Sequence, residues 1–285
     1  MEPIHQALIW FVPGLIVLIC ASILIFDEDN KVNIDSFKRS LWRSRGPLSL
    51  IFVIGLALQV ENLLQDLFEP GFRVSDAVYR FEGVSHIVWM QETLDNQILV
   101  HASSIFYVLG FSFFVAMIPI FFMLREEIEL VDEFAKALTV NYIFLIAGYL
   151  SLHLVVTSHQ SGAVDALMYE HEQYYALIQL VNRPVNCWPS GHTSIPFTIT
   201  LISVYSTKLK RLSRFSMVFT AITIIIILYL GVHWVIDIPG GIMVGIIAYW
   251  VASKGKLDSV FEKITDPVEK YTSILAERLK DRKRN

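Results

Sequence analysis

The segment Phe215–Ser253 decides the fold, and its sequence is FSMVFTAITIIIILYLGVHWVIDIPGGIMVGIIAYWVAS. About 20 apolar residues are enough for one α-helix to cross a bilayer, so the segment is too long for a single crossing. Gly231 and the run Pro239–Gly241 bracket the natural break in it. Its apolar character is continuous and lacks strand-like alternation. The segment therefore predicts two membrane-spanning helices, because a helix satisfies its own backbone polar groups inside lipid.

The composition of the whole chain also indicates a membrane protein. Of the 285 residues, 54% are hydrophobic and 18% are charged, whereas a soluble domain carries roughly 25% charged residues. We predict an all-α polytopic helical bundle of about seven transmembrane helices, with interfacial helices on the outer side. The predicted spans are Gln6–Phe26, Pro47–Leu64, Val100–Leu124, Ala137–Thr157, His192–Thr207, Phe215–Gly231 and Ile238–Ala252.

The chain divides into a transmembrane domain, residues 1–253, and a tail, residues 254–285. In the polar section Gln65–Leu99, apolar side chains are scattered among charges, which is typical of short helices at a membrane interface. The tail has apolar residues at near-helical spacing with basic residues between them. We predict that it forms an amphipathic helix attracted to anionic lipid.

Basic residues predict the orientation in the membrane. Twenty of the 23 Lys and Arg residues lie in the loops after the first, third and fifth spans and in the tail, while Arg73, Arg80 and Arg183 lie on the opposite side. Cytoplasmic loops carry the excess of positive charge. We therefore predict an integral cell-membrane protein with the N-terminus outside and the C-terminus in the cytoplasm, as seven spans require.

Charge and cysteine content exclude other classes. A net charge of −4 and a pI near 6.1 argue against nucleic acid as a partner, which requires a concentrated basic face. Cys20 lies inside the first predicted span and Cys187 in a polar loop. Because a bond between them would join two depths of the membrane, we expect no disulfide framework.

Three short segments place ionisable groups at span ends, where such groups are costly unless they are used. These segments are Asn182-Arg183-Pro184, Pro189-Ser190-Gly191-His192, and Gly231-Val232-His233 followed by Asp237. The predicted topology places all three on the outer face.

Together these residue types suit phosphoryl transfer. Pro189 and Ser190 precede a helical run, so the helix would present free N–H groups to an anion. Gly191 permits close backbone approach, and Arg183 can bind two phosphate oxygens. One histidine would attack phosphorus while the other protonates the leaving oxygen. Asp237 would orient the ring of His233, as the carboxylate of a hydrolase triad does.

In order and spacing, the three segments resemble the signature of the type 2 phosphatidic acid phosphatase superfamily, over roughly residues 142–252. The resemblance implies a metal-independent lipid phosphatase without a cofactor. His233 would be the nucleophile that forms a phosphohistidine, Asp237 its orienting partner and His192 the general acid. Arg183, Ser190 and Gly191 would hold the phosphate.

The sequence departs from the family pattern at two places. Ala176 stands where the family usually has a Lys seven residues before the Arg, and Ile226-Ile227 stands where it usually has Ser-Arg. A set reduced to two histidines and an aspartate resembles the phosphotransferase branch, the inositol phosphorylceramide synthases and sphingomyelin synthases. The Pro-Ser-Gly-His segment resembles the phosphatase branch.

Several functions therefore stay open. The leading hypothesis is a lipid-phosphate phosphatase at the outer leaflet, and the second is transfer of the phosphoryl headgroup to an alcohol such as inositol or a lipid hydroxyl. A zinc site of His192, His233 and Asp237 and an anion or lipid transporter without catalysis are the other candidates. The identity of the lipid phosphate and the presence of a homo-oligomer are not fixed by the sequence.

Three further polar positions near the outer interface have two interpretations each. His159 is read first as a solvated loop residue and second as a replacement for a missing cation. Glu61 and the segment Phe81–His86 are read first as amphipathic anchors and second as part of an acceptor pocket.

Overall fold

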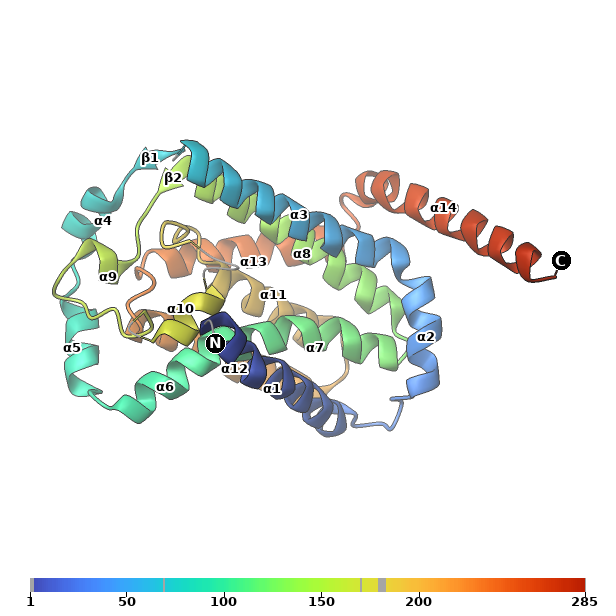
Figure 1. The fold of residues 1–285 in the computed structure, drawn as a ribbon, viewed down its shortest axis with the longest axis horizontal. Helices are drawn as coiled ribbons and strands as arrows, with labels where there is room; N and C mark the ends of the chain where they lie inside the picture. Colours follow the sequence, from blue (N-terminus) through green and yellow to red (C-terminus); the bar gives the residue numbers. More distant parts are fainter. Residues whose placement is uncertain (1–2, 69, 170, 179–182, 285) are drawn as a thin grey trace.

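The computed structural model describes residues 3–68, 70–169, 171–178 and 183–284. Figure 1 shows long helices running side by side in one bundle, with short elements at one end and α14 projecting beyond the other. The prediction of an all-α helical bundle is confirmed. The helices are α1 (Pro3–Phe26), α2 (Ile34–Arg43), α3 (Arg45–Phe68), α4 (Ser75–Glu82), α5 (Ser85–Thr93), α6 (Gln97–Ile105), α7 (Phe111–Leu124), α8 (Ile128–Ser151), α9 (Thr157–Gln160), α10 (Glu172–Ile178), α11 (Gly191–Tyr205), α12 (Lys210–Tyr229), α13 (Asp237–Ser253) and α14 (Asp258–Arg284).

Two short irregular features complete the fold. A π-helical turn, η1 (Phe106–Gly110), joins α6 to α7 so that the three form one long span. Strands β1 (Phe72–Arg73) and β2 (Leu152–His153) pair in parallel, with Phe72 opposite Leu152. The pairing ties the end of α3 to the end of α8.

Within the described residues, five helices are long and apolar enough to cross a membrane, and the count is six if the bent pair of α13 and α14 is one span. The sequence therefore predicts about seven spans, more than the five or six helices that meet this criterion of length and composition. The five are Ile4–Phe26, Arg45–Phe68, Gln97–Leu124, Ile128–Ser151 and Lys210–Tyr229. Helix α11 has 15 residues, which corresponds to a length of about 22 Å against a hydrocarbon thickness of about 30 Å.

The fourth predicted span was displaced along the chain. Helix α8 begins at Ile128 rather than Ala137 and ends at Ser151 rather than Thr157. Its early charges stay helical because Lys136 pairs with Asp132 at 2.6 Å and with Asp258 at 2.8 Å. At the other end, the pairing of β2 with β1 takes the chain out of the helix.

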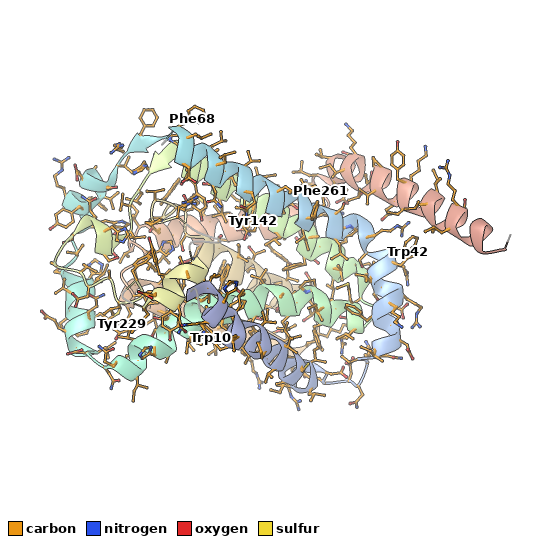
Figure 2. All side chains as sticks on the ribbon, in the orientation of Figure 1. Trp10, Trp42, Phe68, Tyr142, Tyr229 and Phe261 are labelled. Carbon is orange, nitrogen blue, oxygen red and sulfur yellow. The ribbon has the colours of Figure 1, made fainter. Side chains whose placement is uncertain are left out.

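The outer surface of the bundle is apolar, as a lipid-facing surface is. Val17 of α1, Phe52 of α3 and Ile225 of α12 are each more than half exposed. Figure 2 shows Phe68 at one end of α3 and Trp42 near the other. Aromatic residues at both ends of a bundle match the aromatic belts of membrane proteins.

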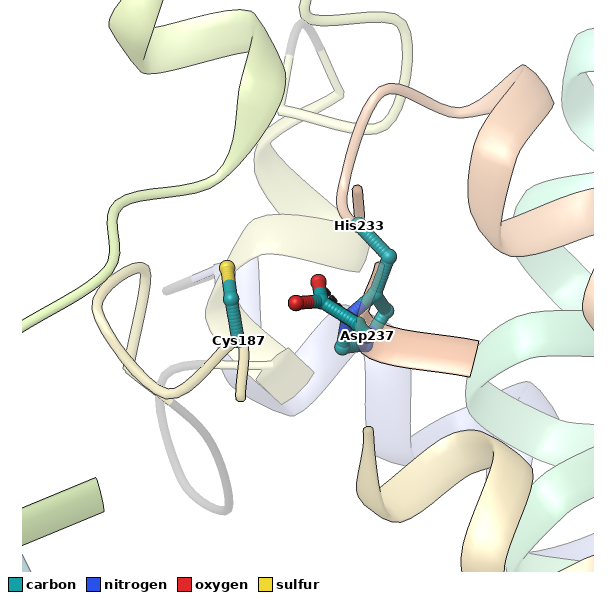
Figure 3. Close-up of side chains that lie close together, drawn as sticks. All are labelled: Cys187, His233 and Asp237. Carbon is teal, nitrogen blue, oxygen red and sulfur yellow. Dashed lines mark hydrogen bonds and ion pairs between the residues drawn. The ribbon is translucent and has the colours of Figure 1, made fainter. Parts of the chain in front are cut away.

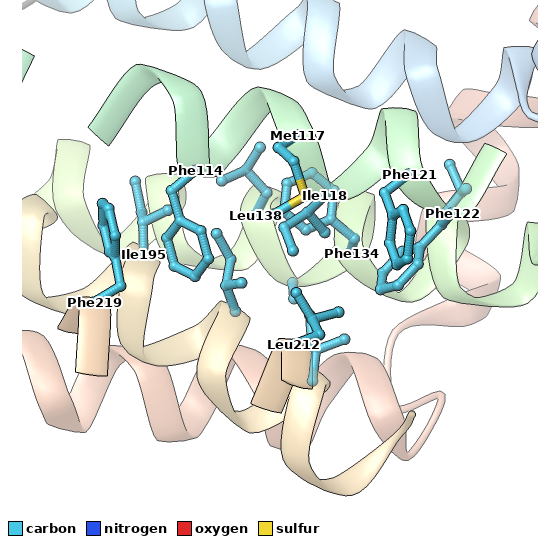
Figure 4. Close-up of a cluster of buried hydrophobic side chains, with 14 of the residues drawn as sticks. Phe114, Met117, Ile118, Phe121, Phe122, Phe134, Leu138, Ile195, Leu212 and Phe219 are labelled. Carbon is cyan, nitrogen blue, oxygen red and sulfur yellow. The ribbon is translucent and has the colours of Figure 1, made fainter. Parts of the chain in front are cut away.

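Buried aromatic side chains hold the centre of the bundle. Phe114 and Phe121 of α7, Phe134 of α8 and Phe219 of α12 form one cluster around α11 (Figure 4). Edge-to-face and offset contacts between such rings add about 0.5–1.5 kcal/mol each to the burial of their surface. The cluster fixes α11 between its neighbours.

Two glycines allow α13 to approach α11 closely. A Cβ atom at Gly241 would lie 2.7 Å from the carbonyl oxygen of Ser190, and one at Gly245 would lie 3.0 Å from that of Ser194. Small residues four apart on a membrane helix permit such close packing. The first residue of α13, Asp237, is thereby brought beside the first turn of α11.

The elements predicted outside the spans also form helices. Helices α4 and α5 lie in the polar section Gln65–Leu99, and the predicted tail forms α14. Arg45 ties α14 to α3 through Thr272 and Ser273, at 2.8 and 3.0 Å. The placement of these helices at the membrane interface stays a prediction, as does the cytoplasmic position of the tail.

Candidate active site

The turn between α12 and α13 positions the first catalytic candidates. Gly231 adopts a φ of +67° there, a conformation that favours glycine. Nδ1 of His233 lies 2.9 Å from Oδ2 of Asp237. The same oxygen accepts a hydrogen bond from the backbone N–H of Trp234 at 2.8 Å. Both side chains are buried, and Figure 3 shows the aspartate against the imidazole ring.

The carboxylate therefore fixes the orientation of the ring. With Nδ1–H donating to Asp237, Nε2 of His233 carries the free electron pair of the neutral imidazole. Burial strengthens this hydrogen bond, because competing water is excluded. The arrangement is the one that the spacing of His233 and Asp237 predicted.

Ser190 connects this turn to the start of α11. Its Oγ lies 3.4 Å from Nε2 of His233 and accepts a hydrogen bond from the N–H of Thr193 at 3.2 Å. Its own N–H donates to the carbonyl oxygen of Asp237 at 3.3 Å. Ser190 is the N-cap of α11, so the N–H groups of Gly191 and His192 have no partner within the helix. Nε2 of His233 thus faces a helix N-terminus, where an anion is stabilised.

His192 reaches the same region from the first turn of α11. Its ring stacks on Tyr107, with ring centres 4.1 Å apart, and contacts Phe111 at 4.4 Å. The centres of the two histidine rings are 6.0 Å apart. The two imidazoles therefore lie close together at the start of α11. A carboxylate holds the ring of His233, and aromatic rings hold that of His192.

A large cavity begins at His192. Its volume is about 640 Å³, and Gly191, His192, Tyr107 and Tyr149 are among the residues that line it. Most of its other walls are apolar side chains of α3, α7 and α8. The site thus has an apolar chamber on the His192 side.

Arg183 lies away from this constellation. Its Nη2 donates to Oδ2 of Asp66 at 2.6 Å, and it lines a smaller pocket of about 270 Å³ with Gln65, His153 and Pro184. This pocket shares no lining residue with the cavity at His192. The structure brings together His233, Asp237, Ser190, Gly191 and His192, and it places Arg183 in the neighbouring pocket.

Sequence reasoning missed the groups that hold the turn in place. The carboxylate of Glu82 on α4 accepts hydrogen bonds from the N–H groups of Val235 and Ile236, at 2.7 and 2.9 Å. The indole of Trp234 donates to the carbonyl oxygen of Val155 at 2.8 Å. Glu82 lies in the polar segment Phe81–His86, so its polarity was a signal, but its partners lie more than 150 residues away.

Gln91 supports the same turn from α5. Its amide nitrogen donates to the carbonyl oxygen of Tyr229, the last residue of α12, at 2.9 Å. Its amide oxygen accepts from the N–H of Asp165 at 2.9 Å. His159 is not part of this support: its ring packs 4.9 Å from that of Tyr169, and burial lowers its pKa.

Cys187 is a third potential metal ligand beside His233 and Asp237. One donor atom from each of the three residues lies within 4.8 Å of the others. Figure 3 shows the three side chains close together. Burial raises the pKa of the Cys187 thiol well above its ordinary value, which disfavours the thiolate that metals bind. Nδ1 of His233 and Oδ2 of Asp237 are already bonded to each other.

The other cysteine lies far from this site. Cys20 is exposed on α1, and both thiols are free.

The structure is thus an all-α bundle with membrane-length helices, in which two histidines and an aspartate lie at a helix N-terminus, where an anion is stabilised. Residues 77–251 match the family described as PAP2 superfamily. The match covers more than half of the chain, and the chain belongs to this superfamily, whose members are generally phosphatase-type enzymes. The match begins in α4, well before residue 142, where the motif resemblance begins. No curated protein and no solved structure shows significant similarity to the chain.

Proposed function

We propose that the chain is an integral-membrane lipid-phosphate phosphatase that works through a phosphohistidine on His233. The observation that carries the proposal is the connected line of Asp237, His233 and Ser190. The carboxylate lies 2.9 Å from one nitrogen of the ring, and the cap of α11 lies 3.4 Å from the other. A phosphate at the helix N-terminus would therefore meet the electron pair of Nε2.

The first half of the reaction forms the covalent intermediate. Nε2 of His233 attacks phosphorus, the bond from phosphorus to the lipid oxygen breaks, and His192 gives its proton to that oxygen. The N–H groups of Gly191 and His192 stabilise the charge on the phosphoryl oxygens. Asp237 stabilises the positive charge that develops on the ring of His233.

The second half regenerates the enzyme. A water molecule attacks phosphorus, its proton goes to His192, and the bond between phosphorus and Nε2 breaks. Inorganic phosphate is released, and both histidines return to their starting states. The cycle requires no metal ion or cofactor, and we propose that the reaction is independent of both.

Transfer to an alcohol is the second candidate. The cavity of about 640 Å³ beside His192 favours it, because an alcohol with a hydrocarbon chain can approach phosphorus from an apolar chamber more readily than bulk water can. The chemistry is the same, with the alcohol oxygen in place of the water oxygen.

We further propose that the site faces the outer side of the membrane. The turn that carries His233 is bonded to Glu82 of α4, at the end of the bundle where α4, α5 and α9 lie (Figure 1). Most of the Lys and Arg residues lie in α2, in the first turns of α12, in α14 and in the loops that adjoin these helices. The positive-inside rule assigns those loops to the cytoplasm.

Purified protein should be mixed with phosphatidic acid labelled at phosphorus and quenched rapidly. We expect label on His233, release of free phosphate, and no loss of rate in a chelator. Absence of label on protein whose phosphatase activity is intact would overturn the phosphohistidine. Movement of labelled lipid into liposomes without phosphate release would favour a transporter instead.

A further inference from the structure

The cavity beside His192 has a polar cluster in an otherwise apolar wall. The cluster consists of Glu61, Asn62, Gln65 and Asn186, three of them from α3. Glu61, Asn62 and Asn186 line the cavity together with His192 and Gly191. Leu58, Phe111, Phe134 and Leu138 are among the apolar residues that surround it.

The carboxylate of Glu61 is deeply buried. Glu61 is 2% exposed, and its Oε1 accepts a hydrogen bond from Asn186 at 3.3 Å. Among the described residues no ion pair within 4.0 Å joins Glu61, although Arg183 is close enough to attract its charge. An acid inside a membrane helix is expensive, and such residues usually face a functional cavity.

The cluster also contains unsatisfied acceptors. Asn186 accepts from Gln65 at 2.6 Å, but Oε1 of Gln65 and Oδ1 of Asn62 are buried without a hydrogen-bond partner. Gln65 is 7% exposed. A buried acceptor without a donor costs free energy that a ligand can recover. In the wall of this cavity, Glu61 and the unpaired Oδ1 of Asn62 therefore favour a ligand that brings hydrogen-bond donors, whereas Gln65 lines the neighbouring pocket of Arg183.

We propose that this cavity binds a lipid alcohol, with its hydrocarbon chain among the apolar side chains and its hydroxyl group on Glu61. Acceptors without donors select hydroxyl groups over phosphates or carboxylates, which would bring further negative charge to the carboxylate. The long apolar lining selects a hydrocarbon chain over a free sugar. The inference rests on the proposed function, because it gives the alcohol a role in that reaction.

The alcohol is either an acceptor or a product of the reaction, and bonds and protons balance in both cases. As an acceptor, its oxygen bonds to the phosphorus held on His233, its proton goes to His192, and the bond between phosphorus and Nε2 breaks. As a product, it is the lipid oxygen that left phosphorus in the first half of the reaction and took the proton of His192. In either case Glu61 positions the alcohol and does not itself react.

Binding can be measured without turnover. Full-length protein in detergent micelles should be titrated with a fluorescent monoacylglycerol and with the same lipid methylated at both hydroxyls. We expect the alcohol to bind about tenfold more tightly than the ether, because only the alcohol can donate a hydrogen bond to Glu61. In Glu61→Gln the preference should fall below about threefold.

Two variants serve as controls. Glu133→Gln changes an acid on α8 that bonds to Ser206 at 2.7 Å outside the cavity, and it should keep the tenfold preference. Gly55→Phe should weaken both ligands equally, because Gly55 lines the cavity and a Cβ there meets no atom within 4 Å. If Glu61→Gln does not fold, Asn62→Leu tests the same cluster.

The two sources are separated by adding monoacylglycerol to labelled phosphatidic acid. A new labelled phosphate ester identifies an acceptor, and competitive inhibition of phosphate release alone identifies a product. Equal binding of alcohol and ether by the wild type, or an unchanged preference in Glu61→Gln, would overturn the proposal. A lost label on His233 with the preference intact would instead overturn the proposed function and leave the alcohol site standing.

Discussion

His233 has one ring nitrogen on a carboxylate and the other at a helix N-terminus, and in the proposed mechanism this arrangement decides which nitrogen reacts. Nδ1 is occupied by Asp237 and Nε2 faces the hydroxyl of Ser190. When a phosphate binds, the Ser190 hydroxyl can donate to a phosphate oxygen and leave Nε2 free to attack. In the proposed mechanism, the reactivity of Nε2 therefore depends on the contacts of His233 with Asp237 and Ser190.

Asp237→Asn tests the orienting carboxylate. The variant keeps the size of the side chain but removes the charge that stabilises the phosphorylated ring, so kcat should fall at least about 100-fold with little change in KM. Steady-state kinetics on phosphatidic acid measures both. An unchanged kcat would mean that Asp237 only caps α13.

His192→Ala tests the general acid. We expect kcat for a lipid phosphate to fall by about 10²–10⁴-fold, the usual contribution of a positioned proton donor. A substrate with an acidic leaving group, such as p-nitrophenyl phosphate, should lose much less activity because its oxygen needs no proton. Equal losses on the two substrates would show that His192 has a structural role on Tyr107 and Phe111.

At this scale, the sequence predicted the groups that share a short spacing. His233 and Asp237 are four residues apart, and Ser190 and His192 are two apart, so local geometry brings each pair together. The placement of Arg183 was not predictable in the same way, because its partner Asp66 belongs to a distant helix. The environment of Glu61 was not predictable for the same reason, because its partner Asn186 lies 125 positions later.

Among the elements, α11 and α13 carry the site, and their close contact depends on Gly241. Gly241→Ala would place a Cβ 2.7 Å from the carbonyl oxygen of Ser190, so α13 must shift. We expect kcat to fall at least tenfold while the protein stays folded, since the shift separates Ser190 from His233. Gly162→Ala is the matched control, because a Cβ there meets nothing within 4 Å.

Circular dichroism and kinetics together check the Gly241 prediction. Retained helicity with reduced kcat supports it. Full activity in Gly241→Ala would show that the contact of α11 with α13 does not position the site.

Glu82 connects the remote helix α4 to the catalytic turn. Glu82→Gln keeps one acceptor oxygen but loses the charge that attracts the two N–H groups of Val235 and Ile236. We expect kcat to fall several-fold in Glu82→Gln with KM unchanged. Glu82→Asp should retain the charge but restore kcat only in part, because its shorter side chain reaches less far. A change in KM with kcat unchanged would show that Glu82 does not position His233.

The elements themselves were largely predictable where apolar runs are bounded by turn residues. The break near Gly231 followed from the length of Phe215–Ser253, and α12 and α13 lie on its two sides. The start of α8 was not predictable in this way, since Lys136 and Glu133 resemble a solvated loop in sequence. Only the fold supplies their partners Asp258 and Ser206.

Across the whole molecule, charge is divided between the two ends of the bundle. Arg125 is buried between Asp27, Asp29 and Glu127, at 2.8, 2.6 and 3.0 Å. It joins the loop after α1 to the loop after α7, at the end opposite His233. The end of the bundle with the basic excess therefore also contains this buried clamp of ion pairs, and it lies opposite the proposed active site.

The clamp predicts how stability depends on pH. The hydrogen bond from Arg125 holds the pKa of Asp29 well below its ordinary value of 3.8. A carboxyl whose pKa is lowered in the folded state stabilises that state above its unfolded pKa and loses this contribution as the pH falls below it. The melting temperature in detergent should therefore decrease as the pH is lowered from about 5 to 3.

Arg125→Met isolates this contribution. The variant leaves three carboxylates close together without their cation, so its melting temperature at pH 7 should lie several degrees below that of the wild type. Protonation of the carboxylates removes their repulsion, so the gap should narrow as the pH approaches 3. Arg39→Met is the control, because Arg39 pairs with Glu126 at 3.2 Å on an exposed surface and such pairs contribute little. A gap that is independent of pH would show that Arg125 stabilises the bundle through packing on Phe121 rather than through its charge.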